Sequence, residues 1–542
     1  TDWFFLKDKI ELQYIGLDDA VIYLQRTDST WNYQFLVDYF SSPQPTRKEG
    51  GIELNLKQAA FSNVTLVQRD AWRGEDLTLQ FASLDIDAEE VSLLNKQVRI
   101  NSIDIDKPFF SVYNYTGNRP PRTVVRSEPL PIINDPNNLR WNPGRWNIFV
   151  KTITLNDGTF KNDRETERGP LDYFDGQHIL FTDINGKFNN TTFQQDSIKS
   201  EIRLSTKERS GMVVKQLVAN VTMHPEAMEF HNLDIQTNRS RIRDYFAMRY
   251  DSFDDMNRFV SKVRLDGNFV DAALSSDDIA WFAPALATWK KDIRLTGRVQ
   301  GPIENLTGRN LVIEAGKDTY LNCSLTLRGL PDIDKTFIDF VAKDFRTTYP
   351  DAIRLLPSLA GIEQPRLDKL EYLRFRGNFF GFVKDFVTYG TLQTSLGKLQ
   401  SDINMKFPDN GPPSYSGTIR TDSFNLGSFM NMSTVGRISF SGNITGRGIH
   451  TNTLIARLDG TIPSLEMNDY TYRNMVVKGE VSNRLFNGEL IIDDSMVHAS
   501  MNGLIDYSKA IPEFNFSADV TRADLRSLKL MPDSVDVQGK FV

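Results

Sequence analysis

Apolar and polar residues alternate along much of this chain with a period of two. Over residues 398–407, Leu399, Ile403, Met405 and Phe407 share one parity, and charged or amide residues occupy most of the other. A period of two places alternate side chains on opposite faces of a β-strand. The same alternation recurs in three further stretches: 97–106, 453–460 and 514–520. Because Asn, Asp and Gly separate such runs, the pattern predicts a mainly β protein with many strands.

Each predicted strand has an apolar face that something must cover. A β-sandwich covers that face with a second sheet, but here one pattern continues over most of the 542 residues. A β-solenoid is built from regular coils, and the repeats of this chain are too long for a single coil. We therefore predict an elongated, curled antiparallel sheet that forms an open apolar groove (a β-taco), with short amphipathic helices inserted. The predicted lipid-binding groove residues are Leu399, Ile403, Met405, Phe407, Leu454, Leu458, Phe514 and Phe516.

An internal repeat occupies the first part of the chain. Residues 6–24 align without a gap on residues 94–112, and the apolar positions of the two segments coincide. Asp18 falls on Asp106 in this alignment. The repeat predicts one unit, two strands joined by a tight turn, that is used twice.

A second repeat is marked by paired glycines. The form apolar-x-Gly-x-apolar-x-Gly occurs three times and begins a fourth time at 537–542, so we expect the chain to continue beyond that point. A short stretch with apolar residues at helical spacing precedes each copy and predicts a helix. Alternation continues through the glycines, which favours a strand bend or a close backbone approach over a dinucleotide-binding loop. The repeat-marking glycines are Gly297, Gly301, Gly377, Gly381, Gly442, Gly446 and Gly539.

The repeats and the proline distribution predict a division of the chain. A stripe of Trp31, Phe35 and Leu36 predicts a helix in the first part, and clustered prolines predict a long loop after it. The predicted parts are amino-terminal β repeats at 1–113 with a helix near 29–40, a proline-rich loop at 114–147, β-groove at 148–270, a helix-led repeat at 271–361, a groove repeat at 362–423, a helix-led repeat at 424–522 and the start of a further repeat at 523–542.

Composition narrows the function classes. The net charge is -7 with lysine and arginine scattered, so no basic footprint for nucleic acid is present. Cys323 is the only cysteine, which excludes an intramolecular disulfide and a CxxC zinc site. No apolar run reaches the roughly 18 residues of a membrane span. The chain starts without a signal peptide, and we expect that an upstream segment precedes it.

Catalytic motifs are absent from the sequence. The five histidines show no HExxH pair, and neither a GxSxG elbow nor a phosphate-binding loop occurs. Asp493 and Asp494 near His498 are interpreted as turn residues. A metal site at His224 and His231 is the weaker interpretation of that pair. We therefore predict no catalytic residue, no metal and no cofactor, and a protein that is not an enzyme.

A family resemblance rests on four segments: 7–36, 277–286, 442–462 and 470–481. They are similar to the AsmA-like superfamily, and most closely to the TamB-type proteins of diderm bacteria, over nearly the whole chain. The resemblance implies a periplasmic repeating β-groove anchored in the inner membrane by an amino-terminal helix. It also implies contact with an outer-membrane barrel assembly factor of the TamA type through a carboxy-terminal part. We expect both the helix and that part to lie in segments of the protein beyond this sequence.

Three functions remain open from the sequence. The first is a non-enzymatic conduit that carries phospholipid acyl chains from the inner to the outer membrane. The second is a periplasmic chaperone or translocation module that offers its groove or a sheet edge to unfolded outer-membrane barrel proteins. The third is a secreted β-solenoid adhesin or polysaccharide-acting enzyme, which requires clustered acids and aromatic residues on an outer face.

Overall fold

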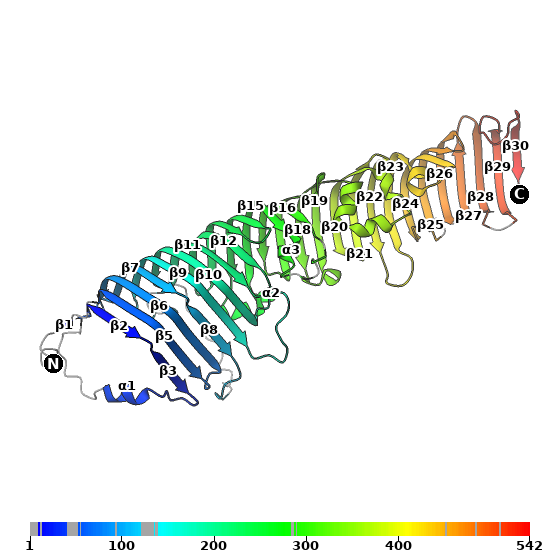
Figure 1. Cartoon of the computed structure of the whole chain (residues 1–542). Helices are drawn as coiled ribbons and strands as arrows, with labels where there is room; N and C mark the ends of the chain where they lie inside the picture. The colour runs from blue at the N-terminus through cyan, green and yellow to red at the C-terminus, as the bar shows by residue number, and fades with distance from the viewer. Residues whose placement is uncertain are drawn as a thin grey trace. The chain divides into compact units, whose positions relative to one another are not determined.

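The computed structural model describes residues 9–10, 13–40, 53–54, 56–92, 95–120, 135, 139–282, 284, 287–288, 290–449, 453–482, 485–508 and 511–542. It separates into two compact units, Thr1–Asp292 with Arg298–Ile303, and Ile293–Gly297 with Glu304–Val542. Strands dominate both units (Figure 1), which confirms the mainly β prediction. The seven-part division stays a prediction. Leu6 and Leu12 of the first repeat and His450, one of the five histidines, lie outside the described residues.

The first unit is built on one large sheet with short helices. Its strands are β1 (Lys9–Ile10), β2 (Tyr14–Asp18), β3 (Val21–Arg26), β4 (Glu53–Leu54), β5 (Gln58–Asp70), β6 (Glu75–Ser92), β7 (Gln97–Asp106), β8 (Phe109–Asn114), β9 (Asn147–Arg164), β10 (His178–Gln194), β11 (Ser197–Glu208), β12 (Val213–His224), β13 (Ala227–Gln236), β14 (Arg241–Arg249) and β15 (Arg264–Ser275). Its helices are α1 (Gln34–Phe40), η1 (Phe253–Arg258), α2 (Phe259–Lys262) and α3 (Ser276–Ile279). Strand β16 (Asp292–Gly301) is divided between the two units.

The predicted tight hairpin of the first repeat is wrong. β2 and β3 run one after the other along β5, parallel to it, from Tyr14 opposite Gln58 onward. β7 and β8 run along β9 in the same way. Each copy is thus one long strand, interrupted at matching positions by Asp19 (φ 50°) and Lys107 (φ 48°). A residue in the left-handed region makes a bulge here instead of a turn, and the sheet is mixed, not wholly antiparallel.

The second unit is an antiparallel meander in which β17 to β30 each pair with the next strand (Figure 1). Its strands are β17 (Asn305–Ala315), β18 (Thr319–Arg328), β19 (Phe337–Thr348), β20 (Tyr372–Phe382), β21 (Asp385–Thr394), β22 (Gly397–Lys406), β23 (Ser414–Asn425), β24 (Val435–Arg447), β25 (Ile455–Met467), β26 (Tyr470–Ser482), β27 (Leu485–Asp493), β28 (Val497–Asp506), β29 (Glu513–Asp524) and β30 (Asp536–Phe541). Its helices are η3 (Ile333–Lys335), α4 (Tyr349–Leu355), η4 (Pro357–Gly361), η5 (Leu367–Leu370) and α5 (Leu426–Met430).

Most helices of the second unit lie along one rim of its sheet. Successive antiparallel strands alternate in direction, so every second connection falls on the same rim. α4, η4 and η5 lie between β19 and β20, and α5 lies between β23 and β24, so both connections fall on what we call the helical rim. The Ser395 hydroxyl of the β21–β22 turn donates to Lys369 O at 2.9 Å, and Arg366 N donates to Phe429 O at 2.8 Å. These bonds join the helices to the turn between them.

A buried aspartate ties a helix to a neighbouring hairpin in each unit. Asp351 of α4 is 1% exposed and accepts hydrogen bonds from the backbone N–H of Lys317 (2.7 Å) and Asp318 (2.5 Å) in the β17–β18 turn. Asp278 of α3 accepts from the N–H of Arg239 (3.0 Å) and Ser240 (2.7 Å) in the β13–β14 turn. A carboxylate that accepts backbone N–H groups satisfies donors that the turn leaves open. The helices are therefore attached by polar anchors.

Fully buried apolar side chains gather in limited clusters. In the first unit the cluster comprises Ala219, Val221 and Leu233. In the second unit it comprises Phe440, Ile462, Tyr472, Met475, Val477, Val497, Ala523 and Leu528. The second cluster lies toward the helical rim, because Leu528 belongs to the β29–β30 connection on that rim. Much of the remaining apolar face is only half-buried.

Candidate functional site

Three of the predicted groove residues lie in one row across the sheet of the second unit. Cross-strand register aligns Ile403, Leu458 and Phe516 through the strands between them. The row from β18 to β29 is Leu325, Phe340, Phe379, Thr388, Ile403, Gly417, Ile444, Leu458, Gly479, Gly488, Gly503 and Phe516. Residues opposite one another in a ladder share a face. The row is therefore a line of apolar side chains and glycines on one face, with Thr388 as its one polar member.

A second row runs beside the first, two residues along each strand. It brings Met405 into line with Phe514. Its members from β17 to β29 are Leu306, Leu327, Ile338, Gly381, Phe386, Met405, Tyr415, Gly446, Ala456, Val481, Phe486, Ile505 and Phe514. With no charged residue in either row, the two rows together form a continuous apolar band.

The other three predicted groove residues lie at the margins of this band. Leu399 is opposite Leu392 in a further row toward the helical rim. Phe407 follows β22 at the opposite rim, and its ring stacks on Phe386 with centroids 6.1 Å apart. Leu454 immediately precedes β25 at that same rim. The structure thus places five of the eight residues in two adjacent rows and three beside them.

The predicted groove residues are partly accessible. Leu399, Ile403 and Met405 are half-buried and alternate with exposed polar residues along β22. Phe514 is 53% exposed. Side chains between two packed sheets form a closed core, whereas these side chains keep part of their surface in contact with solvent.

Glycine pairs facing one another across strands are a feature of this face that the sequence did not reveal. Gly377 is opposite Gly390, and Gly442 is opposite Gly460. A Cβ at Gly377 would collide with the carbonyl oxygen of Tyr389 on the next strand, and one at Gly442 or Gly446 would do the same with its own neighbour. The Phe375 ring lies 2.8 Å from the Cβ position of Gly377 and covers the gap. These glycines therefore allow a close backbone approach, with an aromatic ring folded over it.

The acid and histidine clusters have structural roles. Asp494 is buried and accepts from Met496 N (2.9 Å), Arg473 N (3.1 Å) and the Tyr470 hydroxyl. Burial, together with the bond to Asp494, raises the pKa of Tyr470 to about 12. His498 pairs with Asp493 at 2.7 Å. Both aspartates thus anchor the turn between β27 and β28, as their position in the sequence suggested.

The histidine pair of the first unit lies on neighbouring strands without further ligands. His231 lies 3.5 Å from Glu229, and burial lowers the pKa of His224. Across the described part of the chain, no group of three or more His, Cys, Asp or Glu residues is arranged to hold a metal ion. Of the helices in the described ranges, none has the length and apolar character to cross a membrane.

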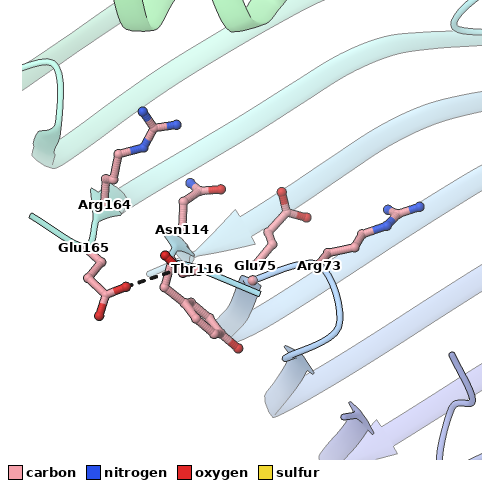
Figure 2. Close-up of a pocket in the computed structure, with 8 residues that line it drawn as sticks. Arg73, Glu75, Asn114, Thr116, Arg164 and Glu165 are labelled. Carbon is pink, nitrogen blue, oxygen red and sulfur yellow. Dashed lines mark hydrogen bonds between the residues drawn. The ribbon is translucent and has the colours of Figure 1, made fainter. Parts of the chain in front are cut away.

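A polar cavity of about 400 Å³ lies at the ends of β6, β8 and β9 in the first unit (Figure 2). Its lining is Arg73, Gly74, Glu75, Asn114, Tyr115, Thr116, Arg164 and Glu165. Thr116 N donates to Glu165 Oε2 at 3.3 Å. In Figure 2 the side chains of Arg73 and Arg164 lie apart, and their guanidinium groups do not converge on one ligand position. The positive charges of the two arginines offset the negative charges of the two glutamates. This polar lining is not suited to acyl chains.

Comparison with protein-family models, with curated proteins and with solved structures finds no match in any of the three. The candidate site therefore stands on the apolar band alone.

Proposed function

We propose that this protein is a non-enzymatic phospholipid conduit, in which acyl chains lie on the apolar band and head groups stay in water. The observation that carries this proposal is the pair of apolar rows that keep register from β18 to β29. A fixed chemical site would need a few convergent polar groups. A line of apolar side chains suits an extended hydrocarbon chain instead.

The first unit supports the same proposal with a row of its own. The row from β6 to β15 is Val91, Val98, Ile148, Phe193, Ile198, Met223, Met228, Met248 and Leu265. Its methionines are unbranched and adapt to irregular apolar partners. An apolar face thus recurs in both units, as a conduit with several binding positions requires.

Burial energetics favour an apolar occupant. Covering one large apolar side chain contributes about 1.5–3 kcal/mol. A soluble monomer rarely leaves more than about 300–600 Å² of contiguous apolar surface uncovered. The two rows carry mostly half-buried apolar side chains across many strands, so a bound lipid would cover the surface that they still expose and would stabilise the protein as well as be carried by it.

The resemblance to TamB-type proteins supplies the proposed setting. The conduit would lie in the periplasm, anchored to the inner membrane and reaching a TamA-type assembly factor in the outer membrane, to which it would deliver phospholipid for outer-membrane biogenesis. The described residues supply the apolar face on which this role depends. Anchor and docking regions remain part of the proposal.

The chaperone alternative requires a free pairing edge, and the outer edge of β3 is partly occupied. Asn32 Nδ2 donates to Tyr23 O at 3.0 Å, Gln25 N donates to Asn32 Oδ1 at 3.0 Å, and Asn32 N donates to Gln25 O at 2.8 Å. An added strand would need these same backbone groups. The lipid proposal has no such requirement.

The decisive experiment places a charge on each face of one strand. Ile403→Arg inserts a cation into the apolar row, and Asn404→Arg places the same side chain one residue away on the solvated face. We expect Ile403→Arg to lower phospholipid transfer between donor and acceptor vesicles about tenfold or more, because a charged group on an apolar path is costly to desolvate. Asn404→Arg should transfer as the wild type does.

Phe516→Arg and its neighbour Asn515→Arg repeat the comparison at the far end of the row. Circular dichroism and thermal unfolding establish that all four variants fold. Equal transfer by the wild type, Ile403→Arg and Phe516→Arg would contradict the proposal.

A further inference from the structure

A second cavity opens on the polar face of the second unit, opposite the apolar band. It has a volume of about 540 Å³ and lies over β21, β22, β23 and β24. Its side-chain lining is Tyr389, Thr391, Gln400, Asp402, Thr418, Arg420, Ser441 and Asn443. Gly390, Ser401, Ile419 and Gly442 contribute the floor between them. The proposed lipid path uses none of the eight lining side chains.

The lining side chains form two rows in register. Tyr389, Asp402, Thr418 and Asn443 are successive cross-strand partners, and so are Thr391, Gln400, Arg420 and Ser441. Pairing of β21 with β22 and of β22 with β23 runs without a register shift. The rows therefore present one polar side chain about every 4.8 Å along the hollow.

Three polar side chains of the hollow's lining are available to a ligand. In the described part of the chain, the side chains of Gln400, Asp402 and Arg420 form no hydrogen bond or ion pair with another residue. On the same strands, Lys406 pairs with Asp385 at 2.9 Å. Amide, carboxylate and guanidinium groups together offer both donors and acceptors to a ligand.

An aromatic platform borders the same hollow. Tyr389 is 52% exposed, and Asn378 Nδ2 donates to its hydroxyl at 2.5 Å, which holds the ring in place. Phe380 (53% exposed) and Val387 (37% exposed) are cross-strand partners on the same face and extend the apolar strip. This strip departs from the alternation of apolar and polar residues between the two faces. An exposed ring beside free amides combines an apolar surface with directional hydrogen bonding.

We propose that this hollow binds a linear oligosaccharide of pyranose units. A pyranose ring has an apolar C–H face, which suits stacking on Tyr389, and a rim of hydroxyls, which suits Gln400 and Asn443. The strand spacing of about 4.8 Å is close to the length of one ring in an extended chain. Successive rings thus meet successive polar side chains.

Other ligand classes fit this hollow less well. An acyl chain would cover the polar side chains of the lining without offering them hydrogen-bond partners, which costs free energy. Nucleic acid needs several phosphate contacts, and Arg420 is the one basic residue of the lining. An extended peptide that adds as a strand needs a sheet edge, whereas these strands are paired on both sides. Glycoside hydrolysis needs two carboxyl groups, and Asp402 is the sole one in the lining, so the hollow binds saccharide without cleaving it.

Calorimetric titration with cellotetraose, chitotetraose and maltotetraose tests the proposal and distinguishes glucose-type from N-acetylglucosamine-type chains. We expect an extended β-linked tetrasaccharide to bind the wild type. Tyr389→Ala and Asn443→Ala should each weaken that binding about tenfold, equivalent to about 1.4 kcal/mol. Tyr389→Phe should retain most of it, since it keeps the ring.

Tyr507→Ala is the matched control, because Tyr507 is also 52% exposed in the second unit but lies outside the lining. It should bind as the wild type does. Absence of heat and of chemical-shift change with all three tetrasaccharides at about 10 mM would overturn the proposal. Equal affinity in Tyr389→Ala and the wild type would overturn it too. Vesicle transfer by Tyr389→Ala should be unchanged, so this test stands apart from the lipid test.

Discussion

Strands β9 to β11 of the first unit and strands β20 to β23 of the second unit are interrupted by different means. In the first unit, long strands carry Asp or Asn residues in the left-handed region, such as Asp157 (φ 52°), Asp183 (φ 51°) and Asn190 (φ 52°), and the pairing of β9 with β10 and of β10 with β11 shifts register near them. In the second unit, β20 to β23 pair without a shift, and facing glycines such as Gly377 and Gly390 relieve the crowding.

This difference determines how residues of one face are spaced along the sequence. A bulge adds one residue and moves the following side chains to the other face. A glycine in a regularly paired strand adds no extra residue, so the side chains after it stay on the same faces. The apolar positions of β20 to β22 therefore keep a simple period of two, whereas strands with a bulge change parity at it: β9 and β10 in the first unit and β23 in the second, where the pairing shifts between Thr421 and Phe424.

The largest effect is expected from a methyl group at a facing glycine. Gly377→Ala would force its Cβ against the Tyr389 carbonyl. Because backbone must shift to relieve that contact, we expect a loss of about 3 kcal/mol or more in the free energy of unfolding, measured by urea denaturation. Gly361→Ala, where no atom lies within 4 Å, is the control and should change stability by less than about 0.5 kcal/mol.

In the first unit the neighbours of Gly186 are the side chains of Phe188 and Leu204, which can move aside. Gly186→Ala should cost clearly less than Gly377→Ala. An equal loss at both sites would contradict the proposed difference between the units.

A smaller effect is expected from removing a helix anchor, which both units share. Asp351→Ala leaves the Lys317 and Asp318 N–H groups without their acceptor. We expect a loss of about 2–3 kcal/mol and faster hydrogen exchange at those two amides. Asp278→Ala should act similarly on the turn at Arg239 and Ser240. Asp334→Ala, an exposed residue at the opposite rim, should leave exchange unchanged.

The smallest effect is a pH dependence at Asp344. Hydrogen bonding to Arg346, aided by Arg374, holds its pKa at about 2 despite partial burial. A carboxyl whose pKa is lowered on folding stabilises the protein above its unfolded pKa of about 3.9 and loses that contribution as the pH falls toward the folded value. We expect the urea midpoint to fall between about pH 4 and pH 2, and Asp344→Asn to reduce that fall.

The effect should stay small, because partly exposed ion pairs contribute about 0.2–1 kcal/mol. A midpoint with the same pH profile in Asp344→Asn and the wild type would show that this carboxyl does not contribute.

Regular alternation made the second unit predictable from sequence. Ile403, Leu458 and Phe516 were selected by parity within separate strands, and the ladder places them in one row. The alternation within a strand identifies which residues share a face. Which residues lie opposite one another on adjacent strands depends on the register between distant segments, and no local pattern contains that information. The facing of Gly377 with Gly390 and the oligosaccharide hollow were missed for this reason.

The first repeat shows the opposite case. Its alignment locates equivalent residues, but the predicted tight turn between the two strands falls where the structure has Asp19 and Lys107 in the left-handed region. Residues in the left-handed region occur both in turns and in bulges. The choice between them depends on β5 and β9, which are distant in sequence and hold each pair of strands in one line.

Native mass spectrometry of the protein purified in mild detergent tests the central claim most directly. We predict several co-purified phospholipids per chain, retained in Asn404→Arg and lost from Ile403→Arg. A folded, stable and lipid-free wild-type protein would contradict the account, because its apolar band would then be covered by protein and not by acyl chains.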